Sequence, residues 1–70
     1  MKVIDILKKL GEFENVCLRP AVIHPHDMTA LFGTPAVLRG QKHIAITSTV
    51  ERITTGQWQN SHCIFVFYRT

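Results

Sequence analysis

Apolar residues near the start of the chain recur with the period of an α-helix. The repeating positions are Val3, Ile6, Leu7 and Leu10. They fall at i, i+3, i+4 and i+7, which places them on one helical face, and the polar residues between them fall on the other. Gly11 follows and favours a helix end. The pattern predicts an amphipathic helix that stops at Gly11.

Residues 13–24 (FENVCLRPAVIH) alternate in the manner of a half-buried strand. Val16 and Leu18 share one side, and Cys17 and Arg19 share the other. Pro20 has no amide hydrogen to donate to a neighbouring strand. We therefore predict a strand that lies at a sheet edge or breaks at Pro20.

The segment that follows, HPHD, reads as a loop. Pro25 restricts His24 to an extended conformation, and Asp27 is a good helix N-cap. The sequence predicts one short helical turn near residues 27–32, closed by Gly33. Residues 34–35 (Thr-Pro) then suit a cap and first helical position, or a loop.

The last third of the chain predicts a β-hairpin. Two β-rich runs, residues 43–53 and 58–70, flank the sequence TTGQ, and a two-residue turn at Thr55-Gly56 fits the preference of tight hairpins for glycine. In that register Ile44 lies opposite Phe67.

The run CIFVFY, residues 63–68, is apolar at both odd and even positions. Such a strand is normally covered on both faces. The N-terminal helix can cover one face. The other face, which the register builds from Ala45, Ile64, Val66 and Tyr68, needs the middle of the chain or a second subunit. This is the specific reason to expect self-association.

Together these elements predict a single α+β domain over residues 1–70. An N-terminal amphipathic helix packs on a small antiparallel β-sheet that ends in a C-terminal hairpin. The composition, 46% hydrophobic and 19% charged, also favours self-association, because so short a chain gains little stability from one core.

Charge and hydropathy give further expectations. The net charge of +3 suits an acidic partner, but the eight basic residues are spread along the chain. No continuous apolar run resembles a signal peptide or approaches the roughly 20 residues of a membrane-spanning helix. We therefore expect a cytoplasmic protein that does not associate with membranes.

Catalytic and metal chemistry find little support in the sequence. His62 and Cys63 are adjacent, so on a strand they point to opposite faces and cannot form a catalytic pair. The two cysteines, Cys17 and Cys63, are too few for a disulfide framework, and we expect free buried thiols. His24 and His26 are the candidate metal ligands, but no zinc-type spacing accompanies them. We expect no enzyme activity, no catalytic residue and no cofactor.

Three functional hypotheses remain. The first is a non-enzymatic binding module that acts through a protein–protein interface and self-associates, or docks on a larger protein. The residues of that interface would be Thr47, Thr49, Arg52, Trp58, Ile64, Val66 and Tyr68. The alternative is nucleic-acid binding by a basic and aromatic surface. Its residues would be Lys8, Lys9, Arg52, Trp58 and Arg69. The third is metal binding through His24 and His26.

Overall fold

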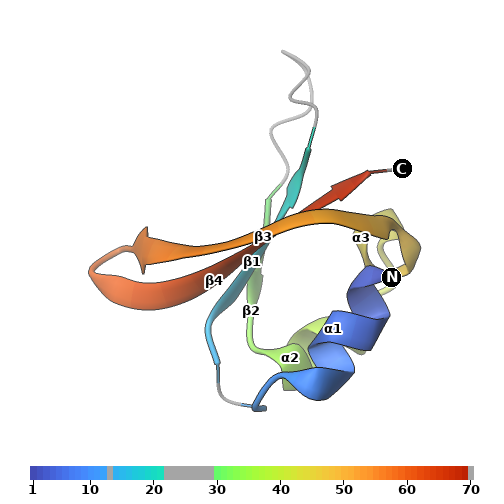
Figure 1. Cartoon of the computed structure of the whole chain (residues 1–70). Coiled ribbons are helices and arrows are strands. Elements are labelled where there is room, and N and C mark those ends of the chain that lie inside the picture. Colours follow the sequence, from blue (N-terminus) through green and yellow to red (C-terminus); the bar gives the residue numbers. More distant parts are fainter. Residues whose placement is uncertain (13, 22–29, 70) are drawn as a thin grey trace.

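The structure is a computed structural model that describes residues 1–12, 14–21 and 30–69. Within them the chain forms three short helices and four strands (Figure 1). In chain order these are α1 (Val3–Lys9), β1 (Val16–Pro20), β2 (Leu31–Gly33), α2 (Pro35–Leu38), α3 (Ile44–Thr47), β3 (Thr49–Trp58) and β4 (Ser61–Arg69). The predicted α+β class, with its N-terminal helix and C-terminal hairpin, is confirmed.

The four strands form one sheet in the order β2-β1-β4-β3, and it is mixed, whereas the sequence predicts a sheet that is antiparallel throughout. β1 pairs antiparallel with β2 but parallel with β4, and β4 pairs antiparallel with β3. β1 is therefore an interior strand rather than an edge strand, and it ends at Pro20. Of the two positions predicted for Pro20, the break is the one observed.

The core lies between the three helices and one face of the sheet (Figure 1). On α1, Val3 and Leu7 are buried, as the helical period predicts. Around them are buried Val16, Leu18, Leu38, Ala45, Ile46, Val66 and Tyr68. Lys8 and Lys9 lie on the solvent side of the same helix. One hydrophobic stripe therefore fixes α1 on the sheet.

This core corrects the expected cover of β4. Val66 is fully buried and Tyr68 is 4% exposed, both in the core beneath the helices, with half-buried Ile64 packed against them. The face that the helices cover is thus the one for which the sequence predicts cover by the middle of the chain or a second subunit. α2 and α3, from the middle of the chain, cover it together with α1. The face that they leave free carries the odd-numbered residues Cys63, Phe65 and Phe67, because successive side chains on a strand point to opposite faces.

The predicted hairpin turn is wrong. The turn is formed by Gln59 and Asn60, whose φ angles of 51° and 65° are both positive. Two positive φ angles define the type I′ turn, which matches the twist of a hairpin better than common turns do. In the observed register Gly56 pairs with Cys63, and a bulge lies between Val50 and Arg52.

Two further local predictions are also corrected. Residues 44–47 form α3 rather than the start of a strand, with the Nδ1 atom of His43 accepting a hydrogen bond from the Ala45 amide at 3.1 Å. Leu31 and Phe32 lie in β2 rather than in a helical turn, and Ala30 before them is in neither a helix nor a strand. Residues 27–29 of that predicted turn lie outside the described residues. α2 begins at Pro35 after Thr34, as the cap-and-first-turn alternative predicts.

Candidate nucleic-acid interface

The face of the sheet opposite the helices, here called the outer face, is built from alternate residues of all four strands. Directly paired residues share a face. The register therefore places these residues on it: Cys17, Arg19, Phe32, Thr49, Arg52, Thr54, Gly56, Trp58, Ser61, Cys63, Phe65, Phe67 and Arg69. Among the described elements, no helix covers this face.

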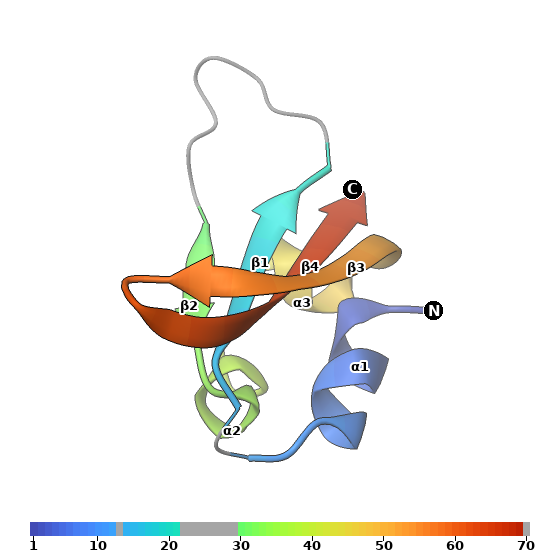
Figure 2. The same ribbon diagram turned by 60° about the vertical axis from the view of Figure 1, so that its left-hand side comes forward.

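The end of the β3–β4 hairpin curls over one part of the outer face. Figure 2 shows the end of β3 crossing in front of β1 and β2. At this crossing Trp58 reaches Phe32 of the far edge strand, with ring centroids 6.4 Å apart. Gly56 permits the curl, because a Cβ atom there would lie 3.0 Å from the ring of Phe65. The hairpin thus brings residues from the two edges of the sheet together.

Arg19 lies at the centre of this arrangement. Its guanidinium carbon is 5.3 Å from the ring centroid of Trp58 and 5.9 Å from that of Phe65. Both distances fall in the range of cation–π attraction. Its Nε atom is buried without a hydrogen-bond partner among the described residues. Arg19 is therefore positioned by two aromatic rings rather than by a described carboxylate.

A second stack lies nearer the open end of the face. The guanidinium carbon of Arg52 is 4.3 Å from the ring centroid of Phe67. Both residues border a hollow of about 280 Å³ together with Ala21 and Glu51. Arg52 is exposed and Phe67 is half-buried, so a guanidinium and part of an aromatic ring are both accessible at one place.

Arg69 adds a third cation to the outer face. Its exposed side chain pairs with Glu51, which lies at the bulge of β3. The other described carboxylates belong to α1 or to the segment that follows it, namely Asp5, Glu12 and Glu14. Counting described residues only, the outer face and its rim carry three arginines and one carboxylate. The surface is therefore positively charged.

Two buried thiols lie on the same side of the sheet, beneath the arginines and aromatic rings. Cys17 and Cys63 are free and fully buried, as the sequence predicts. Burial raises the pKa of the Cys63 thiol above its ordinary value, and the nearby Cys17 raises it further. A thiol that keeps its proton is a poor nucleophile and a poor metal ligand. The two cysteines lie buried beneath the arginines and aromatic rings and supply no reactive group.

The structure brings together part of the predicted nucleic-acid set. Arg52, Trp58 and Arg69 all lie on the outer face. Lys8 and Lys9 do not, because α1 packs on the other side of the sheet. The lysines therefore contribute to net charge but not to this surface.

The residues of the predicted protein interface are dispersed. Thr49 lies at the start of β3 on the outer face, opposite Arg69, whereas Thr47 is exposed on α3. Val66 and Tyr68 are buried in the core, and Ile64 packs against it. Only Arg52 and Trp58 belong to both predicted sets and to the outer face. A protein interface stays a prediction, but the core residues are not available to form it.

Sequence reasoning missed four members of the outer face: Arg19, Phe32, Phe65 and Phe67. The sequence places Arg19 in a strand. Because it alternates with Val16 and Leu18, its side chain could have been assigned to the face opposite theirs. The two phenylalanines of β4 were read as core because their run is apolar at every position. Nothing local in the sequence indicates that Phe32 meets Trp58, because that contact depends on the curl of the hairpin.

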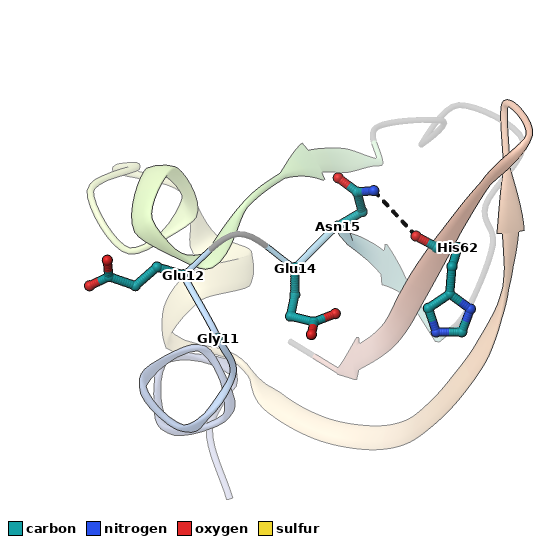
Figure 3. Close-up of a pocket in the computed structure, with 5 residues that line it drawn as sticks. All are labelled: Gly11, Glu12, Glu14, Asn15 and His62. Carbon is teal, nitrogen blue, oxygen red and sulfur yellow. Dashed lines mark hydrogen bonds between the residues drawn. The ribbon is translucent and has the colours of Figure 1, made fainter.

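A second hollow, of about 450 Å³, lies between the segment after α1 and the start of β4 (Figure 3). The Nδ2 atom of Asn15 donates to the backbone oxygen of His62 at 3.3 Å. The side chain of Glu12 points away from those of Glu14 and His62 and pairs with Arg39 at 3.5 Å. In the described ranges, no group of three or more His, Cys, Asp or Glu side chains could hold a metal ion. This hollow therefore lacks the geometry of a metal centre.

The histidines proposed as metal ligands, His24 and His26, lie outside the described residues.

Comparison of the chain with protein-family models, with curated proteins and with solved structures gives no match. No helix within residues 1–12, 14–21 and 30–69 is long and apolar enough to cross a membrane.

Proposed function

We propose that the protein is a non-enzymatic binding module whose outer face binds single-stranded nucleic acid. The observation that carries this proposal is the pair of arginine–aromatic stacks, Arg19 between Trp58 and Phe65, and Arg52 on Phe67, on a positively charged sheet face. The sequence favoured a protein partner over nucleic acid. The grouping of charge with aromatic rings on one face reverses that order.

The chemistry of a single strand matches this surface in two ways. Phosphates are attracted by guanidinium groups, which bind them with paired hydrogen-bond donors. Unpaired bases stack on aromatic rings and on guanidinium planes, which contributes about 1–3 kcal/mol per base. A duplex hides the faces of its bases, so it can satisfy only the first of these interactions.

Salt dependence of binding is the decisive test. Each phosphate contact with a single strand contributes about −0.7 to the slope of log K against log salt concentration, and three arginines therefore give a slope of about −2. Fluorescence anisotropy with a labelled single-stranded oligonucleotide measures this slope. Arg52→Gln should lower affinity and reduce the magnitude of the slope by about 0.7, because it removes one contact.

Lys8→Gln is the matched control, since it removes one positive charge from the opposite side of the molecule. It should leave the slope nearly unchanged. Equal effects of the two substitutions would show that net charge alone attracts the oligonucleotide, and the proposed face would be wrong. Absence of binding by the wild-type protein at low salt would contradict the function itself.

A further inference from the structure

One long strand edge of the sheet has no partner among the described residues. β3 is the last strand in the sheet order, so one side of its backbone faces away from β4. Near its start Val50 donates to Met1 at 2.8 Å, and Thr49 forms an isolated bridge with Lys2. Beyond the bulge, residues 52–58 make no described backbone hydrogen bond to an element other than β4. Half of the hydrogen-bonding groups in this segment therefore remain available.

The side chains of the same segment are unusually exposed for a strand. Residues 51–55 are all exposed, although they alternate between the two faces of the sheet. Ile53 is an apolar side chain with 46% of its surface exposed. Natural edge strands are commonly protected by charged side chains, proline, β-bulges or very short length. The bulge of β3 lies before this segment, between Val50 and Arg52. Residues 53–58 have no charge and no proline, and the whole strand is ten residues long.

We propose that two copies of this chain pair antiparallel along the free edges of β3. The occupant is a second copy because the edge is complementary to itself in one register. When the twofold axis passes through Thr55, Arg52 of each copy lies opposite Trp58 of the other, and Ile53 lies opposite Gln57. Residues directly opposite in an antiparallel pair share a face, so each of the two Arg52–Trp58 pairs places a guanidinium beside an indole ring.

This pairing would join the two sheets into one of eight strands. It would place the two outer faces side by side and align their arginines and aromatic rings across the axis. The contact is small compared with a standard interface of about 1,600 Å². We therefore expect a dimer that dissociates on dilution rather than a permanent one.

The first test is mass as a function of concentration, measured without nucleic acid by sedimentation or light scattering. The wild-type protein should approach twice the chain mass of 8.0 kDa as its concentration rises. Thr55→Lys places two like charges opposite each other on the axis and should give a monomer at the same concentrations. Thr47→Lys, an exposed threonine on α3, is the matched control and should still dimerise. A wild-type monomer at every concentration would overturn the proposal.

The second test fixes the register. Thr55→Cys would place two thiols opposite each other, where the Cα atoms of antiparallel partners are about 4.5–5.5 Å apart and a disulfide can form. We expect a covalent dimer under mild oxidation, and no such dimer from Thr47→Cys. The native Cys17 and Cys63 are fully buried and should not compete. A dimer in solution that gives no Thr55→Cys crosslink would place the contact elsewhere and overturn this inference.

Arg52 and Trp58 belong to both proposed surfaces, but the tests of pairing substitute Thr55, which pairs with Ile64 and is not on the outer face. A wild-type protein that stays monomeric at every concentration but binds the oligonucleotide would contradict only the pairing of β3. A wild-type protein that dimerises but does not bind the oligonucleotide at low salt would contradict only the nucleic-acid assignment.

Discussion

The arginine side chains of the outer face lie against aromatic rings instead of extending freely into solvent. Arg19 contacts two rings and Arg52 contacts one. Such stacking holds the planar guanidinium in place and so reduces the entropy lost when it binds a phosphate. Arg19 could be placed on this side of the sheet from strand parity alone. Its stacking partners could not, because they come from the other end of the chain.

The thiol of Cys63 gives a pH prediction at the same scale. Its folded-state pKa is raised above the ordinary value of 9.0 by burial and by Cys17. The folded protein therefore keeps a proton that the unfolded chain loses. This contribution to the free energy of unfolding is fully present below about pH 9.0 and is lost as the pH rises through the folded pKa.

Urea denaturation of the wild-type protein and of Cys63→Ala at several pH values checks this prediction. The wild-type free energy of unfolding should fall more steeply above pH 9.0 than that of the variant. The other ionisable groups are common to both proteins, so the comparison isolates the contribution of Cys63. Identical pH dependence in the two proteins would contradict the assignment.

At the scale of elements, the spacing of apolar residues predicted helices and strands correctly only where the pattern was long enough to show a clear period. The stripe on α1 was identified correctly because it spans two turns of a helix. Residues 44–47 were misassigned because a short apolar run has no period that separates helix from strand. The hairpin was identified, but its turn was placed at the glycine. Gly56 instead lies within the strand, where a Cβ atom would come to 3.0 Å from the ring of Phe65. This approach is a contact between two strands that local sequence does not encode.

The observed turn predicts opposite effects of two glycine substitutions. Asn60→Gly should stabilise the protein by up to about 1 kcal/mol, because glycine adopts a positive φ without steric cost. Thr55→Gly should destabilise it by about 1 kcal/mol, because glycine in the middle of a strand loses more backbone entropy and packs poorly. Chemical denaturation of both variants measures these differences. A turn at residues 55–56 would instead make Thr55→Gly neutral or stabilising.

At the scale of the whole molecule, the two faces of the sheet differ in the residues that they carry. The face beneath α1, α2 and α3 holds the hydrophobic core, and the outer face collects three arginines around half-buried aromatic rings. Composition predicted one domain with a net positive charge. The apolar residues at both odd and even positions of residues 63–68 predicted that both faces of β4 are apolar. Which face the helices cover could not be predicted, since it depends on how β1 enters the sheet between β2 and β4.

Fluorescence of Trp58 during titration with a single-stranded oligonucleotide tests the central claim most directly. Trp58 is the one tryptophan of the chain and lies within the proposed site, beside Arg19 and Phe32. We predict saturable quenching by the single strand that added salt reverses, and much weaker quenching by a duplex of the same length. Emission that does not change with the oligonucleotide, or that responds equally to single strand and duplex, would contradict the account.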